Sequence, residues 1–234
     1  MDYLQLFEDL RAHRTDDAQA MSAYLRHQFL FLGIKSGKRR ELTHAYLKQV
    51  KQEARQKVKD YPEAAVIDWD FVQACWQQEE REFQYIATDY LRNMQVYLKA
   101  ENLGQLKQLI TTKSWWDSVD ALVKTVGCLS HNNPELKEQL LKWSVSENLW
   151  LRRTAIIHQL NMKDKLDQAL LEQAIVNNFG SKEFFINKAI GWALRDYARY
   201  NEAWVIEFLR QYQAQLAPLS WREANKHINL SEEV

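Results

Sequence analysis

Apolar side chains recur along almost the whole chain at the three- and four-residue spacing of one helix face, with polar residues between them. The breaks in this pattern are short and carry turn residues, as at Asn132-Asn-Pro134, Gly180-Ser181 and Pro218. The pattern predicts helices over residues 2–13, 16–27, 67–78, 81–98, 102–111, 115–129, 134–144, 148–161, 164–178, 182–199, 201–213 and 219–228. A further helix is predicted to open near Lys38, with Ser36 as its N-cap. The predicted fold class is therefore all-α.

Four alanines, each in the middle of a predicted helix, stand 34 residues apart, at positions 87, 121, 155 and 189. Five residues before each of the last three stands an aromatic residue, and the residue after each is Leu or Ile. This period is typical of helix-turn-helix units stacked in a solenoid of the HEAT or TPR sort, where small residues allow close helix approach. We predict an α-α superhelix with a concave binding face, formed by a single domain over residues 1–234. The N-terminal helices occupy 1–60 and the repeats about 67–228.

Equivalent helices of such an array lie side by side, so equivalent positions form rows across it. One helix phase is aliphatic and predicts the core, namely Leu122, Val123, Ile156, Ile157, Ile190 and Leu194, with Trp115 also on the buried side. Another phase predicts a row along a concave groove, namely Trp116, Asp120, Lys124, Trp150, Thr154, His158, Phe184, Lys188 and Trp192, with Arg153 in the adjacent phase. A tryptophan beside a carboxylate on a displayed face has no packing role, so this row is the candidate site.

The composition agrees with a helical intracellular protein. Only 6 Gly and 3 Pro occur in 234 residues, and 46% of the side chains are hydrophobic. Cys75 and Cys128 are too few for a disulfide framework, and Cys128-x-x-His131 has no second pair to make a zinc site. The chain shows neither a signal-peptide pattern nor an apolar run of about 20 residues, so we expect a soluble, cytoplasmic protein that does not enter a membrane.

Charge is balanced overall, with 31 basic and 31 acidic side chains, so only a local excess of charge could attract a charged partner. Between Lys35 and Lys59 there are nine Lys or Arg residues and two Glu. Cations such as Lys38 and Arg39 in the first turn of a helix oppose its dipole, which indicates a phosphate as their partner. The alternative is an ordinary solvated helix face.

The predicted row combines indole rings and cations, which suits a nucleic-acid strand, with one discordant group. Asp120 would repel phosphates, so its carboxylate is better explained by stabilising a developing positive charge or by orienting a water molecule. Cleavage of a glycosidic bond generates such a charge on the sugar. The row therefore points to chemistry on a nucleoside.

Several strings along the chain carry a resemblance to a known family: Phe29-Leu-Phe-Leu-Gly-Ile34, Thr112-Lys-Ser-Trp-Trp-Asp-Ser-Val-Asp120, Asn148-Leu-Trp-Leu-Arg-Arg-Thr-Ala-Ile156 and Ser181-Lys-Glu-Phe-Phe-Ile-Asn-Lys-Ala-Ile-Gly-Trp192. They resemble the AlkD family of bacterial DNA glycosylases, the HEAT-like-repeat alkylpurine glycosylases. The similarity extends from Tyr24 to Leu216-Ala-Pro-Leu-Ser220. The resemblance implies excision of cationic N3- or N7-alkylated purines from double-stranded DNA, as a step of base excision repair, without a metal or organic cofactor and with the protein acting as a monomer.

The resemblance also implies roles for individual residues. Asp120 matches the catalytic aspartate, Trp116 and Trp192 match the tryptophans that grip the DNA backbone, and Arg153 matches a phosphate contact; these four form the expected catalytic set. The expected DNA-binding set is Tyr24, Lys38, Arg39, Lys113, Phe184, Phe185, Lys188 and Arg195. The chain departs from the pattern at Asn161, where a characterised member has lysine, and the absent cation bears on DNA affinity and lesion preference.

Each of these roles has an ordinary structural alternative. Arg153 could form a salt bridge with Glu147 or another acid, Trp192 could be a core residue beside Gly191, and one of the adjacent Phe184 and Phe185 should be buried. A non-catalytic helical-repeat scaffold that binds damaged or branched DNA, or a protein partner, is the competing hypothesis for the whole chain. Asp120 discriminates between the two, because a pure DNA binder gains nothing from a carboxylate.

Overall fold

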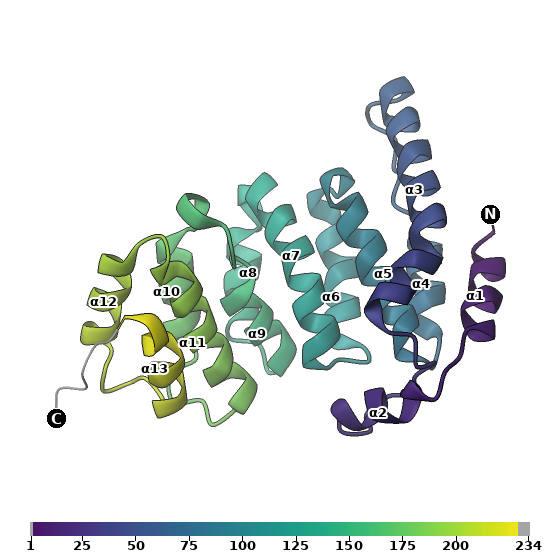
Figure 1. Ribbon diagram of the computed structural model, residues 1–234. Coiled ribbons are helices and arrows are strands. Elements are labelled where there is room, and N and C mark those ends of the chain that lie inside the picture. The colour runs from purple at the N-terminus through teal and green to yellow at the C-terminus, as the bar shows by residue number, and fades with distance from the viewer. Residues whose placement is uncertain (1, 229–234) are drawn as a thin grey trace. The chain divides into compact units, whose positions relative to one another are not determined.

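A computed structural model describes residues 2–228 of the chain (Figure 1). Those residues form thirteen α-helices and five short 3-10 helices, and the only strand-like pairing among them is an isolated bridge between Leu30 and Glu80. The predicted all-α fold is confirmed. None of the helices between residues 2 and 228 is both long and apolar enough to cross a membrane. The chain divides into two compact units, Met1–Leu98 and Lys99–Val234. The expected single continuous domain, with its N-terminal part at 1–60, stays a prediction.

The first unit contains α1 (Tyr3–Ala12), α2 (Asp17–Tyr24), α3 (Ser36–Asp60), α4 (Trp69–Gln77) and α5 (Arg81–Met94). Helix α3 packs against α1 and α5, and α4 packs against α5. Aromatic rings fill the space between them, with Phe71 at 5.0 Å from Tyr46 and 5.2 Å from Tyr90, centroid to centroid. The C-terminal half of α3 runs on beyond α4 and α5 (Figure 1), so much of its surface faces solvent.

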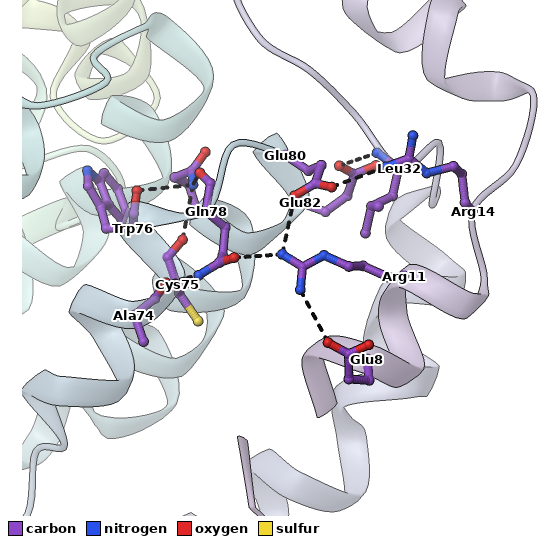
Figure 2. Close-up of polar contacts among 11 residues, drawn as sticks. Glu8, Arg11, Arg14, Leu32, Ala74, Cys75, Trp76, Gln78, Glu80 and Glu82 are labelled. Atoms are coloured by element: carbon purple, nitrogen blue, oxygen red, sulfur yellow. Dashed lines mark hydrogen bonds and ion pairs between the residues drawn. The ribbon is translucent and has the colours of Figure 1, made fainter. Parts of the chain in front are cut away.

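A buried carboxylate fixes the loop between α2 and α3. Glu82, in the first turn of α5, is 0% exposed and accepts hydrogen bonds from the backbone N–H groups of Leu32, Gly33 and Ile34 at 2.8–3.0 Å. Figure 2 shows this carboxylate reaching Leu32. Gly33 has φ +88°, and a Cβ there would lie 2.6 Å from backbone atoms of Thr15 and Ala18. The loop is therefore held rigidly by its own sequence and by one side chain.

The second unit contains α6 (Leu103–Thr111), α7 (Trp116–Asn132), α8 (Lys137–Trp143), α9 (Leu149–Ile157), α10 (Gln168–Val176), α11 (Phe184–Ala198), α12 (Glu202–Gln211) and α13 (Pro218–Ala224). Helices α7, α9, α11 and α13 contact one another in succession, as Figure 1 shows for the first three. Helix α6 packs on α7, both α8 and α10 pack on α9, and α12 packs on α11. The unit is thus two layers of helices, which is the predicted helical-repeat arrangement.

Short 3-10 helices occupy the joints at Gln95–Tyr97, Ala100–Asn102, Pro134–Leu136, Lys163–Lys165 and Asn225–His227. Polar side chains cap several α-helices where their first N–H groups lack partners. Asn148 accepts from the N–H groups of Trp150 and Leu151, while Asp167 caps α10 and Asn201 caps α12. The predicted core is confirmed, because all six of its aliphatic residues are at most 2% exposed.

Several predicted boundaries are corrected; the helices expected over 81–98 and 219–228 end at Met94 and Ala224. The helix expected over 16–27 ends at Tyr24, because Arg26 and His27 adopt left-handed backbone angles of φ 57° and 56°. The helix expected over 148–161 ends at Ile157, and the helix expected over 164–178 begins at Gln168 behind its cap. Ser36 is the first residue of α3 and not its cap, since Lys35 occupies the N-cap position without a side-chain hydrogen bond.

Neither cysteine forms a disulfide: Cys75 is buried in α4 and Cys128 is half-buried in α7. Burial raises the pKa of both thiols, which makes them poor nucleophiles. Among residues 2–228, no cluster of three or more His, Cys, Asp or Glu side chains could hold a metal ion.

Candidate functional site

A carboxylate and a guanidinium meet between α7 and α9. Arg153 Nε and Nη2 each donate to one oxygen of Asp120, both at 2.8 Å, which is the parallel two-bond geometry of a strong charge-assisted pair. The side chain of Arg153 is only 4% exposed, whereas that of Asp120 is 19% exposed. Asp120 is therefore the member of the pair that a ligand can reach.

Two opposing effects act on Asp120. Burial raises the pKa of its carboxyl above the ordinary value, the hydrogen bonds and charge of Arg153 lower it, and the nearby Asp117 raises it; the net shift is upward. The two-bond pairing requires the ionised form of Asp120. Arg153 is thus the group that keeps this half-buried carboxylate charged and fixed in one orientation.

Helix α11 contributes the remaining wall of the site. Arg153 Nη1 donates to the backbone carbonyl of Phe185 at 2.7 Å, and the guanidinium carbon lies 5.9 Å from the ring centres of both Phe185 and Trp192. Trp192 is partly buried against the apolar core of this unit. Three neighbouring helices therefore position one pair of charges, and the predicted meeting of Asp120, Arg153 and Trp192 occurs.

An aromatic cluster supports α9 and α11 beside the pair. Trp150 is 9% exposed, and its ring lies 5.8 Å from that of Trp115 and 5.1 Å from that of Phe185. Of the adjacent phenylalanines, Phe184 is 57% exposed and Phe185 is half-buried against the cluster, so neither is the core residue that was expected. Trp115, which the repeat pattern assigns to the core, is half-buried in this cluster.

The part of the predicted row that lies on α9 is wrong. Thr154 and His158 are 0% and 2% exposed, and Trp150 is packed away from solvent, so none of the three lines a groove. The reason is that α9 touches α6, α7, α8, α10 and α11, which leaves little of its surface free. His158 bonds the Ala155 carbonyl at 2.9 Å, and burial lowers its pKa to about 4.

Arg153 forms the salt bridge that was the alternative to its expected role, with Asp120 in place of Glu147 as the partner. Its guanidinium bonds Asp120 and the Phe185 carbonyl and is nearly inaccessible. The contact of Arg153 with a DNA phosphate stays a prediction. Arg153 is best described as a positioning residue for Asp120.

A second charge cluster joins α11 to α13. Glu223 is 3% exposed and binds Lys188, Arg195 and Lys226 at 2.8, 2.6 and 2.8 Å. Burial acts to raise the pKa of Glu223, but the three cations outweigh it and lower the value to about 2. Glu223 stands 34 residues after Ala189, at the next position of the register, but a glutamate replaces the alanine there, so the alanine pattern does not mark it. The two predicted DNA-binding cations in this cluster, Lys188 and Arg195, keep 37% and 21% of their side chains exposed.

The other predicted residues lie as follows. Trp116 starts α7, one turn before Asp120, and is half-buried; Lys113 precedes it with a left-handed φ of 50°. In the first unit, Tyr24 ends α2 and is 74% exposed, and Lys38 pairs with Glu41 at 2.6 Å.

Arg39 is buried in the first unit. It is 8% exposed, pairs with Asp89 at 3.3 Å, and its guanidinium carbon lies 4.8 Å from the ring centre of Tyr85. This cation in the first turn of α3 thus has partners within the unit, and its contact with DNA stays a prediction.

Asn161 occupies the turn after α9 with a left-handed φ of 63°, and its N–H donates to Asp196 at 2.7 Å. Asparagine tolerates this backbone conformation better than most residues.

The fold and the site define a class of protein. It is a helical-repeat protein in which a guanidinium holds a half-buried carboxylate, with exposed aromatic and basic side chains nearby. The profile of the family described as DNA alkylation repair enzyme matches residues 6–228. A solved structure described as a predicted DNA alkylation repair enzyme from Enterococcus faecalis is 34% identical, with a TM-score of 0.81 over 92% of this chain and 96% of that one. No curated protein matches the chain. The chain belongs to the DNA alkylation repair enzyme family, which supports a role in alkylation repair and DNA as its partner.

Proposed function

We propose that the protein is a monofunctional DNA glycosylase that hydrolyses the N-glycosidic bond of cationic N3- or N7-alkylated purines in duplex DNA. The observation that carries this proposal is the state of Asp120, a carboxylate that is half-buried, held by Arg153 through two bonds, and open on one side. A group so fixed is prepared to stabilise positive charge, and DNA binding alone gives it no purpose.

The proposed reaction needs no strong general acid. An alkylated purine already carries positive charge, so its bond to C1′ breaks with both electrons going to the base, and the sugar becomes oxocarbenium-like. The Asp120 carboxylate stabilises that sugar and accepts a hydrogen bond from the attacking water. A C1′–O bond replaces the C1′–N bond, the water proton passes to solvent, and the free base and an abasic site are the products.

Burial makes this electrostatic stabilisation effective. A carboxylate in fully aqueous surroundings would interact with the sugar through a high dielectric, whereas the half-buried Asp120 is only 19% exposed. The Arg153 guanidinium offsets the free-energy cost of that burial. The exposed side of the carboxylate remains open to the substrate.

The neighbouring aromatic residues hold the DNA backbone in the proposed complex. Trp116, one helical turn before Asp120, and Trp192, beside the Arg153 guanidinium, are each half-buried, so part of each indole can pack on deoxyribose and its flanking phosphates. Phe184, with its exposed ring, lies at the start of the same helix as Trp192. No metal or organic cofactor enters the proposed reaction.

The decisive test is Asp120→Asn with duplex DNA that contains 7-methylguanine. The amide keeps the size of the side chain but removes the charge, so we expect release of the free base to fall by at least about 100-fold, the scale of losing one preorganised electrostatic contact. Affinity for the duplex should stay within a few-fold of wild type. Base release is measured by chromatography, and affinity by fluorescence anisotropy.

Asp117→Asn is the matched control, because it removes the same charge from the first turn of the same helix. It should release base at close to the wild-type rate. Wild-type release by Asp120→Asn would refute the assignment. A wild-type protein that binds the duplex and releases no base would instead support the non-catalytic scaffold.

A further inference from the structure

A groove of about 450 Å³ in the first unit follows one face of α3. Helix α3 forms one wall, and the opposite wall is made by the start of α1 and by residues 65–68, which lead into α4. The charged lining residues are one lysine, Lys57, and three acids, namely Asp2, Glu53 and Asp68. The lining thus has a formal excess of two negative charges, so the groove favours a cation although α3 as a whole is basic.

A buried hydroxyl in this groove lacks a partner within the protein. Tyr46 lines the groove, is only 6% exposed, and its hydroxyl makes no hydrogen bond with any residue between 2 and 228. Burial, with smaller contributions from charges that include Asp68 and Asp2, raises the pKa of Tyr46, so the hydroxyl stays neutral and can accept as well as donate a hydrogen bond. Buried polar groups are normally hydrogen-bonded, and a ligand in the groove would supply the absent partner.

Each of the three carboxylates has an oxygen available to a ligand. Asp2 and Asp68 each use one oxygen to cap a helix, accepting from a backbone N–H at 3.2 and 2.9 Å. Glu53 uses one oxygen to accept from Gln49 at 2.8 Å. None of the three acids forms an ion pair with another residue between 2 and 228. A cation can therefore bind them without breaking a contact of the protein.

The carboxylates are spread along the groove. Asp2 and Asp68 lie at the end near Tyr46, since the charges of both act on its hydroxyl. Glu53 follows Tyr46 by seven residues in α3, which is about 10 Å along the helix axis. Among residues 2–228, no three such side chains are close enough together to hold a metal ion. The groove therefore matches a ligand whose positive charges are separated, and not a compact ion.

Apolar side chains lie between the acidic groups. Val50 and Ala54 are on the wall formed by α3, and Val66 and Ile67 are on the opposite wall. Methylene groups placed between these walls would be removed from water, which is favourable. Ammonium groups separated by an aliphatic chain are the chemistry of a linear polyamine.

We propose that this groove binds a linear aliphatic polyamine, with its methylene chain between the apolar walls and an ammonium group near each acidic end. An ammonium has three N–H donors, and the acceptors at one end are the carboxylates of Asp2 and Asp68 and the hydroxyl of Tyr46. Glu53 accepts from the second ammonium. Binding requires neither DNA nor chemistry at Asp120, so the inference goes beyond the proposed function and does not depend on it.

The first test is titration calorimetry of the protein with spermidine at low ionic strength, where we expect saturable binding with one site per chain. Tyr46→Phe removes the hydroxyl alone and should weaken binding by about 10-fold, the scale of one hydrogen bond to a charged group. Because that hydroxyl has no partner among residues 2–228, thermal unfolding of Tyr46→Phe should match that of wild type. Wild-type affinity in this variant overturns the inference.

A second variant removes charge and keeps the fold. Asp2→Asn with Asp68→Asn loses two carboxylates, but asparagine serves as well as aspartate at the N-caps of α1 and α4. We expect a loss of about 10-fold in affinity for spermidine, since the two ion pairs would be solvent-exposed. Asp16→Asn with Glu79→Gln is the matched control, because it removes two exposed carboxylates of the same unit that do not line the groove. The control should bind spermidine as wild type does, and an equal loss in both pairs contradicts the proposal.

The length of the ligand separates a polyamine site from general attraction of cations. Spermidine should bind more tightly than propylamine, which carries one ammonium and cannot reach both ends of the groove. Equal affinity for the two amines, or the same binding heat from Mg²⁺ at matched ionic strength, would show that the groove has no polyamine site. Base release is not part of these measurements, so failure of this inference and failure of the glycosylase proposal are distinguishable.

Discussion

Arg153 opposes the effect of burial on the pKa of Asp120, and this balance can be measured. Burial raises the pKa of Asp120 while the bonds and charge of Arg153 lower it. Replacing Arg153 by Gln removes the lowering contribution and leaves the burial. We expect the acid limb of the pH–rate profile for base release to move to higher pH, and the plateau rate to fall by about 10-fold or more because the carboxylate is less firmly oriented.

Arg153→Lys separates charge from geometry. It keeps the positive charge and loses the two-bond pairing, so its acid limb should lie between those of wild type and Arg153→Gln. Spontaneous depurination, measured without enzyme at each pH, is subtracted. If the limb of Arg153→Gln coincides with that of wild type, Arg153 does not set the protonation of Asp120.

At the scale of elements, the junction of α11 and α13 depends on the absence of one side chain. A Cβ on Gly191 would lie 2.4 Å from Cβ of Glu223 and 2.7 Å from the backbone oxygen of Ser220, and neither atom can move without shifting α13. We expect Gly191→Ala to lower the free energy of unfolding by about 1–3 kcal/mol, the usual cost of overpacking. Urea unfolding followed by tryptophan fluorescence measures it.

Gly104→Ala provides the comparison. Gly104 lies in α6, and a Cβ there meets no atom within 4 Å, so the substitution should be neutral or stabilising by up to about 1 kcal/mol through helix propensity. Equal effects of the two substitutions would show that close approach of α13 is not what requires Gly191.

The same scale explains which features the sequence predicts well. Helices and the aliphatic core follow from local spacing, so the burial of Leu122, Ile156 and Ile190 can be predicted from the amino-acid pattern alone. The turns that follow α2 and α9 contain the left-handed residues Arg26 and Asn161. Because these are not glycines, the amino-acid pattern does not reveal the turns. Burial of His158 depends on how many helices pack around α9, and the spacing of apolar residues within one helix does not contain that information.

The candidate site is predictable only in part. A register of 34 residues brings Asp120 and Arg153 into adjacent rows, which indicates that they are close but not that they bond directly. Glu223 captures Lys188 and Arg195 from a different helix, and such a pairing follows from tertiary packing alone. The ion-pair partners of Lys188 and Arg195 therefore cannot be inferred from their neighbours in sequence.

At the scale of the whole molecule, buried groups with shifted pKa values contribute to the change of stability with pH. His158 has a folded-state pKa of about 4, below its ordinary value of 6.5. The unfolded chain therefore takes up a proton before the folded one does, and stability falls as the pH drops from 6.5 to 4. Asp120 acts in the opposite sense, because its pKa is raised.

Glu223 extends this loss to lower pH. Its pKa is about 2 in the folded protein against an ordinary 4.5, so the stability that it contributes is complete above pH 4.5 and is lost as the pH falls towards 2. At about 1.4 kcal/mol per pKa unit, neither His158 nor Glu223 can contribute more than about 3–4 kcal/mol.

Two variants should remove the two windows separately. The unfolding free energy of His158→Gln, measured in urea at about pH 7, 5 and 3, should lack the decline between pH 6.5 and 4 that wild type shows. Glu223→Gln should keep that decline and lack the one below pH 4.5, because its amide cannot be protonated in this range. Only the slopes against pH are compared, so a uniform loss of stability in either variant does not affect the outcome. If both variants follow the wild-type curve, other groups govern the acid sensitivity of this protein.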